Sequence, residues 1–193
     1  MASTFGQKMV ALKIGSYKGY GTLKLKSGEL INDTLHYGFA DPYRVFLSKK
    51  KANDPLELPK KFSPGDVEYF TIGDTTFVSV KTGQAITGTF MIRITPADYK
   101  IQVLKTYEQS EDKTRIITKY YALFPGQKNA KDIMNDLSLM PFAGKVSKLI
   151  ADCPDLSAKV KNKEAPYKIP TLSNEKNFFE VIMKVADAYQ TCN

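Results

Sequence analysis

The sequence predicts an α+β protein: an antiparallel β-barrel or sandwich over about residues 8–124, then a helical C-terminal unit over 125–193 that a disulfide closes. Three observations predict this arrangement. Up to residue 124, short alternating or apolar runs are broken by turn residues about every 8–12 positions. After Pro125-Gly126, apolar residues recur at helical spacing. The two cysteines, Cys153 and Cys192, both lie in this second part.

The first seven residues are expected to lie outside the fold. Met1-Ala2-Ser3 is typical of an added initiator, and the small residues Thr4 and Gly6 stand at positions −3 and −1 of a possible cut before Gln7. This pattern favours a remnant left after removal of a secretory signal peptide, and hence an extracytoplasmic location, periplasmic or secreted. The alternative is a short cytosolic N-terminus.

The β-region is expected to contain short strands joined by tight turns. Gly73-Asp74 is a two-residue hairpin signal, and Leu23 and Leu25 share one face of a strictly alternating run. The glycine-rich segment 15–21 is interpreted as a flexible turn, since no helix follows it to direct its N-terminus at a phosphate. The expected strands cover 8–14, 22–26, 29–37, 44–47, 66–72, 75–80, 87–95, 99–107 and 114–124.

The C-terminal unit is expected to contain helices over 129–137 and 141–152, a short segment opened by Pro154, and a last helix capped by Ser173 or Asn174. A stripe of apolar side chains on the last helix is typical of core packing. We therefore expect the helices to pack on the β-region and form one compact domain with it. The stripe consists of Phe178, Phe179, Ile182, Met183, Ala186 and Tyr189.

The two cysteines lie at predicted helix boundaries. Cys153 stands between Asp152 and Pro154, and Cys192 is the penultimate residue. A bond between them would close a loop of about 40 residues, which chain-entropy estimates value at roughly 4 kcal/mol. A cysteine at position 192, one residue from the end, has little packing role, so the sequence favours a structural disulfide and an oxidising compartment. The alternative is two free thiols in a reducing cytosol.

Two resemblances accompany these patterns. The runs 21–31, 44–47 and 62–70 resemble the strand order of small SH3-like barrels, which host many functions and imply none. The second resemblance covers most of the chain: a barrel-like start, a β middle, then Asp152-Cys153-Pro154 and a closing helix that ends in Tyr189-Gln-Thr-Cys192. This order is similar to that of uncharacterised exported proteins of Bacteroidetes. That resemblance implies an extracytoplasmic location and a Cys153–Cys192 pair, and it implies no activity.

The sequence contains no established catalytic or phosphate-binding motif, so an enzyme is unsupported and no cofactor is expected. His36, the only histidine, is interpreted as a packed or surface residue of a strand. A zinc site is disfavoured because, once the two cysteines pair, His36 is the only His or Cys ligand that remains in the sequence. The carboxylate pairs Asp66 with Glu68 and Asp132 with Asp136 are candidate acid–base groups, and solvated carboxylates are the simpler interpretation.

The net charge of +8 suggests an anion-binding loop. The candidate residues are Lys49, Lys50, Lys51, Lys60 and Lys61, which bracket a predicted loop. Only three of the 28 basic residues are arginines, and base readout favours the arginine fork, so nucleic acid is disfavoured as a partner. Lysines that only aid solubility or guard strand edges are the simpler explanation.

Three candidate functions follow. The favoured one is a non-catalytic extracytoplasmic binding or interaction protein with a protein or cell-surface partner. The alternatives are a small-ligand-binding protein or hydrolase with an atypical site in the barrel mouth, and an anion binder that uses the lysine loop. Tyr17, Tyr20, Tyr37 and Tyr43 could stack on a sugar in place of the absent tryptophan, although core packing explains them as well.

Overall fold

The computed structural model describes residues 15–47, 59–83, 86–112, 114–137, 141–170 and 174–192. Their strands are β1 (Ser16–Leu25), β2 (Leu30–Gly38), β3 (Val45–Leu47), β4 (Lys61–Phe62), β5 (Val67–Ile72), β6 (Thr75–Thr82), β7 (Thr89–Arg93), β8 (Gln102–Gln109), β9 (Ile116–Leu123) and β10 (Asn129–Asp132). The π-helix η1 (Ile133–Leu137) follows, and then the α-helices α1 (Phe142–Leu149), α2 (Pro154–Lys161) and α3 (Glu175–Tyr189). The predicted strand-rich part with a helical C-terminus is therefore confirmed. In these ranges no helix is long and apolar enough to cross a membrane.

The described strands form one large mixed sheet in the order β10-β9-β8-β7-β6-β5-β1-β2-β3-β4. Neighbouring strands in this order are antiparallel. Strand β10 makes a further pairing: Asn129 and Ala130 pair in parallel with β6, whereas Lys131 and Asp132 pair with β9. A single short strand thus bridges two strands that are not neighbours in the sheet order.

Three buried clusters lie along the sheet. The first is aromatic and fills the N-terminal strands, where the Phe70 and Phe77 rings stack with centroids 4.6 Å apart. The second joins the sheet to the helices through Val103, Phe124 and residues of α1 to α3. The third is small and takes one residue from each strand from β6 to β10, namely Val80, Met91, Leu104, Tyr121 and Ala130.

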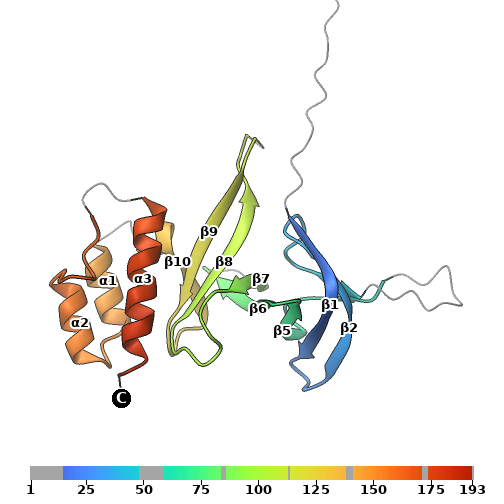
Figure 1. Cartoon of the computed structure of the whole chain (residues 1–193), viewed down its shortest axis with the longest axis horizontal. Coiled ribbons are helices and arrows are strands. Elements are labelled where there is room, and N and C mark those ends of the chain that lie inside the picture. Colours follow the sequence, from blue (N-terminus) through green and yellow to red (C-terminus); the bar gives the residue numbers. More distant parts are fainter. Residues whose placement is uncertain are drawn as a thin grey trace, which may run out of the picture.

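The helical unit packs at one end of the sheet. Figure 1 shows α1, α2 and α3 gathered beside β8, β9 and β10, with β1 and β2 at the opposite end. Asn174 caps α3: its side chain accepts from the Asn177 N–H at 3.2 Å, while the Asn177 side chain accepts from the Asn174 N–H. The predicted disulfide joins Cys153, before α2, to Cys192, after α3, with 5.6 Å between the Cα atoms. The predicted Cys153–Cys192 disulfide is therefore confirmed.

The interpretation of segment 15–21 as a turn is wrong, because Ser16 begins the ten-residue strand β1. Glycine permits a close approach there: a Cβ on Gly21 would stand 1.8 Å from the carbonyl oxygen of Thr71 on β5. No larger residue could let the two backbones come so close.

The helix expected over 129–137 is wrong in its first half. Residues Asn129–Asp132 form β10, and only Ile133–Leu137 are helical. Strand pairing on both sides of β10 decides the conformation against local propensity. The strand expected over 8–14 lies outside the described residues.

Candidate functional site

His36 lies on β2 with an exposed side chain. Its ring centroid is 6.2 Å from that of Phe46 on the adjacent strand β3. This is the geometry of a cross-strand surface pair. In the part of the chain that the structure describes, no group of three His, Cys, Asp or Glu residues is placed to hold a metal ion.

The Asp66 carboxylate stabilises the turn that leads into β5. Its Oδ2 accepts hydrogen bonds from the Ser63 N–H at 3.2 Å and the Ser63 hydroxyl at 2.7 Å. These hydrogen bonds, helped by the charge of Lys26, hold the pKa of the Asp66 carboxyl below its ordinary value. Glu68, the other member of the proposed acid pair, has an exposed side chain on β5.

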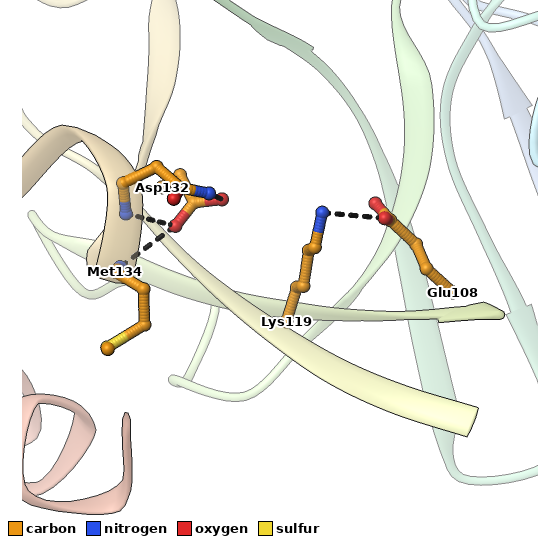
Figure 2. Close-up of polar contacts among 5 residues, drawn as sticks. Glu108, Lys119, Asp132 and Met134 are labelled. Atoms are coloured by element: carbon orange, nitrogen blue, oxygen red, sulfur yellow. Dashed lines mark hydrogen bonds and ion pairs between the residues drawn. The ribbon is translucent and has the colours of Figure 1, made fainter. Parts of the chain in front are cut away.

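Asp132 and Asp136 bind the backbone around η1. The Asp132 carboxylate accepts from the N–H groups of Met134 and Asn135, both at 2.8 Å, and Figure 2 shows the contact with Met134. Asp136 accepts from the Asp132 N–H at 2.8 Å. Both carboxylates therefore satisfy N–H groups where the strand turns into a helix, which is a capping role.

The predicted lysine loop is described only at its end. Lys49, Lys50 and Lys51 lie outside the described residues. Lys60 Nζ lies 5.0 Å from the centroid of the Phe62 ring, and Lys61 Nζ lies 5.8 Å from that of Phe46. The anion-binding loop therefore stays a prediction.

The four tyrosines named from the sequence divide into two pairs. Tyr37 is buried, and its hydroxyl donates to the Phe90 carbonyl at 3.0 Å, while Tyr17 packs edge-on against the Phe77 ring. These two belong to the aromatic core. Tyr20 and Tyr43, at 70% and 54% exposure, are open to solvent.

Tyr43 lines a large cavity, which we call the basic groove. It has a volume of about 1150 Å³ and lies among the ends of β1, β6 and β9 and the segments that precede β3, β5, β7 and β10. Its lining contains four cationic side chains and no carboxylate among the described residues. The groove is lined by Lys26, Tyr43, Arg44, Ser63, Pro64, Gly65, Ser79, Val80, Lys81, Gly83, Ile86, Thr87, Gly88, Leu123, Lys128 and Asn129.

The wall of the basic groove is built around Pro64. Its carbonyl oxygen accepts hydrogen bonds from Lys26 Nζ at 2.8 Å and from the Ser79 hydroxyl at 2.6 Å. Gly88 lies against the same wall, where an added Cβ would stand 2.9 Å from the Val80 carbonyl oxygen and 3.2 Å from Pro64 Cβ. The turn before β5 is thereby fixed against β6, so this side of the groove is preformed.

The cations of the basic groove differ in their freedom. Arg44 lies 3.7 Å from Asp41, and both side chains are largely exposed, so this ion pair is weak. Lys81 and Lys128 have exposed side chains, and within the described ranges no carboxylate lies within 4.0 Å of either. These two lysines are the charges most available to a ligand.

A second, smaller cavity adjoins the basic groove and shares Tyr43 and Thr87 with it. We call it the tyrosine–threonine pocket. Its volume of about 300 Å³ is at the lower end of the range of ligand sites, roughly 300–1,000 Å³. Its lining consists of Phe39, Ala40, Pro42, Tyr43, Thr82, Thr87, Thr89, Met91, Thr106, Tyr107, Glu108, Gln109 and Tyr121.

The boundary between the two cavities is held by the Pro42 carbonyl. It accepts from the Phe90 N–H at 3.1 Å and from the Thr89 hydroxyl at 3.3 Å. These bonds fasten the segment before β3 to β7. They place Tyr43, the next residue, between the groove and the pocket.

The tyrosine–threonine pocket contains one carboxylate, Glu108. Lys119 Nζ approaches Glu108 Oε2 at 2.6 Å across the β8–β9 pair, as Figure 2 shows. Tyr121 lies on the same pair of strands and is buried. Burial, together with the nearby charges of Asp132 and Glu108, raises the pKa of the Tyr121 phenol, which therefore stays protonated at neutral pH.

Comparison with protein-family models, with curated proteins and with solved structures finds no match to this chain.

Neither cavity was identified from the sequence. The four cations of the basic groove are separated by up to about a hundred residues, and each stands alone in its own segment. Because Lys49, Lys50 and Lys51 are consecutive, the sequence instead predicted an anion-binding loop over residues 49–61. Exposed Tyr43 was the one member of the site that sequence reasoning had named.

Proposed function

We propose that this chain is a non-catalytic binding protein that takes an anionic ligand in the basic groove. The observation that carries the proposal is the groove's lining, in which four cations occur without a carboxylate among the described residues. Low-dielectric walls around charges of one sign concentrate ligands of the opposite sign. The net charge of +8 strengthens the same attraction at longer range.

Binding is favoured over catalysis by what the candidate acids do. Asp66 accepts two hydrogen bonds from Ser63, and the Asp132 carboxylate accepts from two backbone N–H groups. A general acid or base must exchange its proton with a substrate. These carboxylates hold backbone turns together instead.

An extracytoplasmic location is part of the proposal. The disulfide between Cys153 and Cys192 supports it, because such bonds persist mainly in oxidising compartments. In such a compartment, anionic glycans and protein surfaces are more accessible partners than nucleic acid.

We also infer that β6 to β10 form a small barrel, with the two cavities at its rim. Support comes from the pairing of β10 with both β6 and β9, and from the buried cluster with one residue from each of the five strands. Val80 of that cluster lines the basic groove, and Met91 and Tyr121 line the tyrosine–threonine pocket. A rim position agrees with the barrel-mouth site considered from the sequence.

The test is binding of the full chain, disulfide intact, to immobilised heparin in a salt gradient. We expect retention at low salt and earlier elution of the double variant Lys81→Gln/Lys128→Gln. In solution its affinity for heparin should fall roughly tenfold, since each exposed charge contributes up to about 1 kcal/mol. The matched control, Lys148→Gln/Lys161→Gln, removes two exposed charges from α1 and α2. Equal losses in both double variants, or no retention of the unmodified chain, would overturn the proposal.

A further inference from the structure

We infer that the ligand is an acidic oligosaccharide in which a charged sugar is followed by a neutral one, the charged sugar lying in the basic groove and the neutral sugar in the tyrosine–threonine pocket. This inference rests on the proposed function and specifies its ligand. The basic groove and the tyrosine–threonine pocket are adjacent. The two cavities share Tyr43 and Thr87, so one chain molecule that passes Tyr43 can occupy both.

The second argument is the chemistry of the pocket. Thr82, Thr89 and Thr106 line it. The Thr89 hydroxyl donates to the Pro42 carbonyl and can still accept, whereas the hydroxyls of Thr82 and Thr106 can both donate and accept a hydrogen bond. Sugar hydroxyls have the same dual capacity. Tyr107 and Tyr121 add rings with a polar tip, which suits the alternating apolar and polar faces of a sugar.

The third argument is the change of charge between the cavities. The basic groove presents Lys81 and Lys128, whereas the tyrosine–threonine pocket presents the carboxylate of Glu108. Because Lys119 pairs with this carboxylate at 2.6 Å, the pocket has little net charge, and the carboxylate still accepts hydrogen bonds from hydroxyls. A ligand with an anionic group on every unit, such as polyphosphate or single-stranded DNA, therefore finds available cations in the groove and no matching charge in the pocket.

The position of Tyr43 completes the argument. Its side chain is exposed where the two cavities meet, and the Pro42 carbonyl ties its backbone to β7. With its backbone held there, Tyr43 can offer a ring face to the sugar that crosses from one cavity to the other. An exposed tyrosine in such a place is typical of a recognition surface rather than of a core.

The experiment is a calorimetric titration of the full chain with three probes of matched length. The first is a hyaluronate oligosaccharide, in which acidic and neutral sugars alternate; the second is oligogalacturonate, in which every sugar is acidic; the third is oligothymidylate. We expect the first to bind at least five times more tightly than the other two. Tighter binding of oligogalacturonate or of oligothymidylate would overturn the inference and identify a uniformly charged ligand.

Two variants make the test specific to the pocket. Thr106→Val keeps the shape of a buried side chain and removes its hydroxyl, so it should weaken hyaluronate binding about tenfold and leave oligogalacturonate binding within twofold. Glu108→Gln should strengthen oligogalacturonate binding several-fold because it leaves the Lys119 cation unpaired beside the pocket. Glu111→Gln, on the exposed turn after β8, is the control for the loss of one negative charge.

The outcomes separate the inference from the proposed function. If the Lys81→Gln/Lys128→Gln variant loses affinity for all three probes but the pocket variants change nothing, the groove binds anions and the inference about the neutral sugar is wrong. If none of the probes binds the unmodified chain, the proposed function is wrong and the inference falls with it.

Discussion

Gly21 allows a close approach between two paired strands, β1 and β5. Its missing side chain lets the Thr71 carbonyl oxygen come within 1.8 Å of the position that a Cβ would occupy. The substitution Gly21→Ala must therefore displace β1 from β5, and overpacking of this kind typically costs about 1–3 kcal/mol. We expect the free energy of unfolding, measured in urea, to fall by an amount at the upper end of that range.

The control for this prediction is Gly15→Ala. Gly15 is exposed, and an added Cβ there would meet no atom within 4 Å. A Gly21→Ala variant as stable as the Gly15→Ala variant would show that the close approach of β1 and β5 does not depend on this glycine.

Asp66 provides a pH-dependent contact beside the basic groove. Because hydrogen bonds from Ser63 depress its pKa in the folded chain, their stabilisation is fully present above the ordinary aspartate pKa of about 3.9 and is lost as the pH falls through the lower folded-state pKa. An NMR titration should therefore show the Asp66 carboxyl titrating below the ordinary value. In Ser63→Ala its pKa should rise towards that value, and an unchanged pKa would refute the assignment.

The disulfide determines how firmly the helical unit is closed. It joins residues 39 positions apart and lies against the cluster that packs α1 to α3 on the sheet. We expect the free energy of unfolding of Cys153→Ser/Cys192→Ser, measured in urea without reductant, to be about 2–4 kcal/mol lower than that of the unmodified chain. Adding reductant to the unmodified chain should give the same loss. Equal stability of the oxidised and reduced chains would contradict a structural role for the bond.

At the scale of single elements, the sequence was most informative where local signals are strong. Pro154 at the first position of α2 and Asn174 at the cap of α3 were both anticipated, because capping geometry depends on neighbouring residues. Strand β10 was missed for the opposite reason. Its four residues are strand only because β6 and β9 lie on either side, and such long-range pairing is not encoded in a short segment.

At the scale of the whole molecule, the predictable part was the division into a sheet followed by helices tied by a disulfide. Alternating and helical periodicities are repeated over many residues, so errors in single positions average out. The site was not predictable in this way. Lys26, Lys81 and Lys128 meet only after β1, β6 and β10 have been brought together, and no pattern in the chain relates their positions.

The central claim, that an anionic ligand occupies the basic groove, is tested most directly by NMR mapping of the full chain with a heparin oligosaccharide. The account predicts that amide shifts concentrate at Gly65, Gly83, Gly88 and Lys128, with α1 to α3 unchanged. Perturbations concentrated on the helices, or confined to residues 49–61, would contradict it.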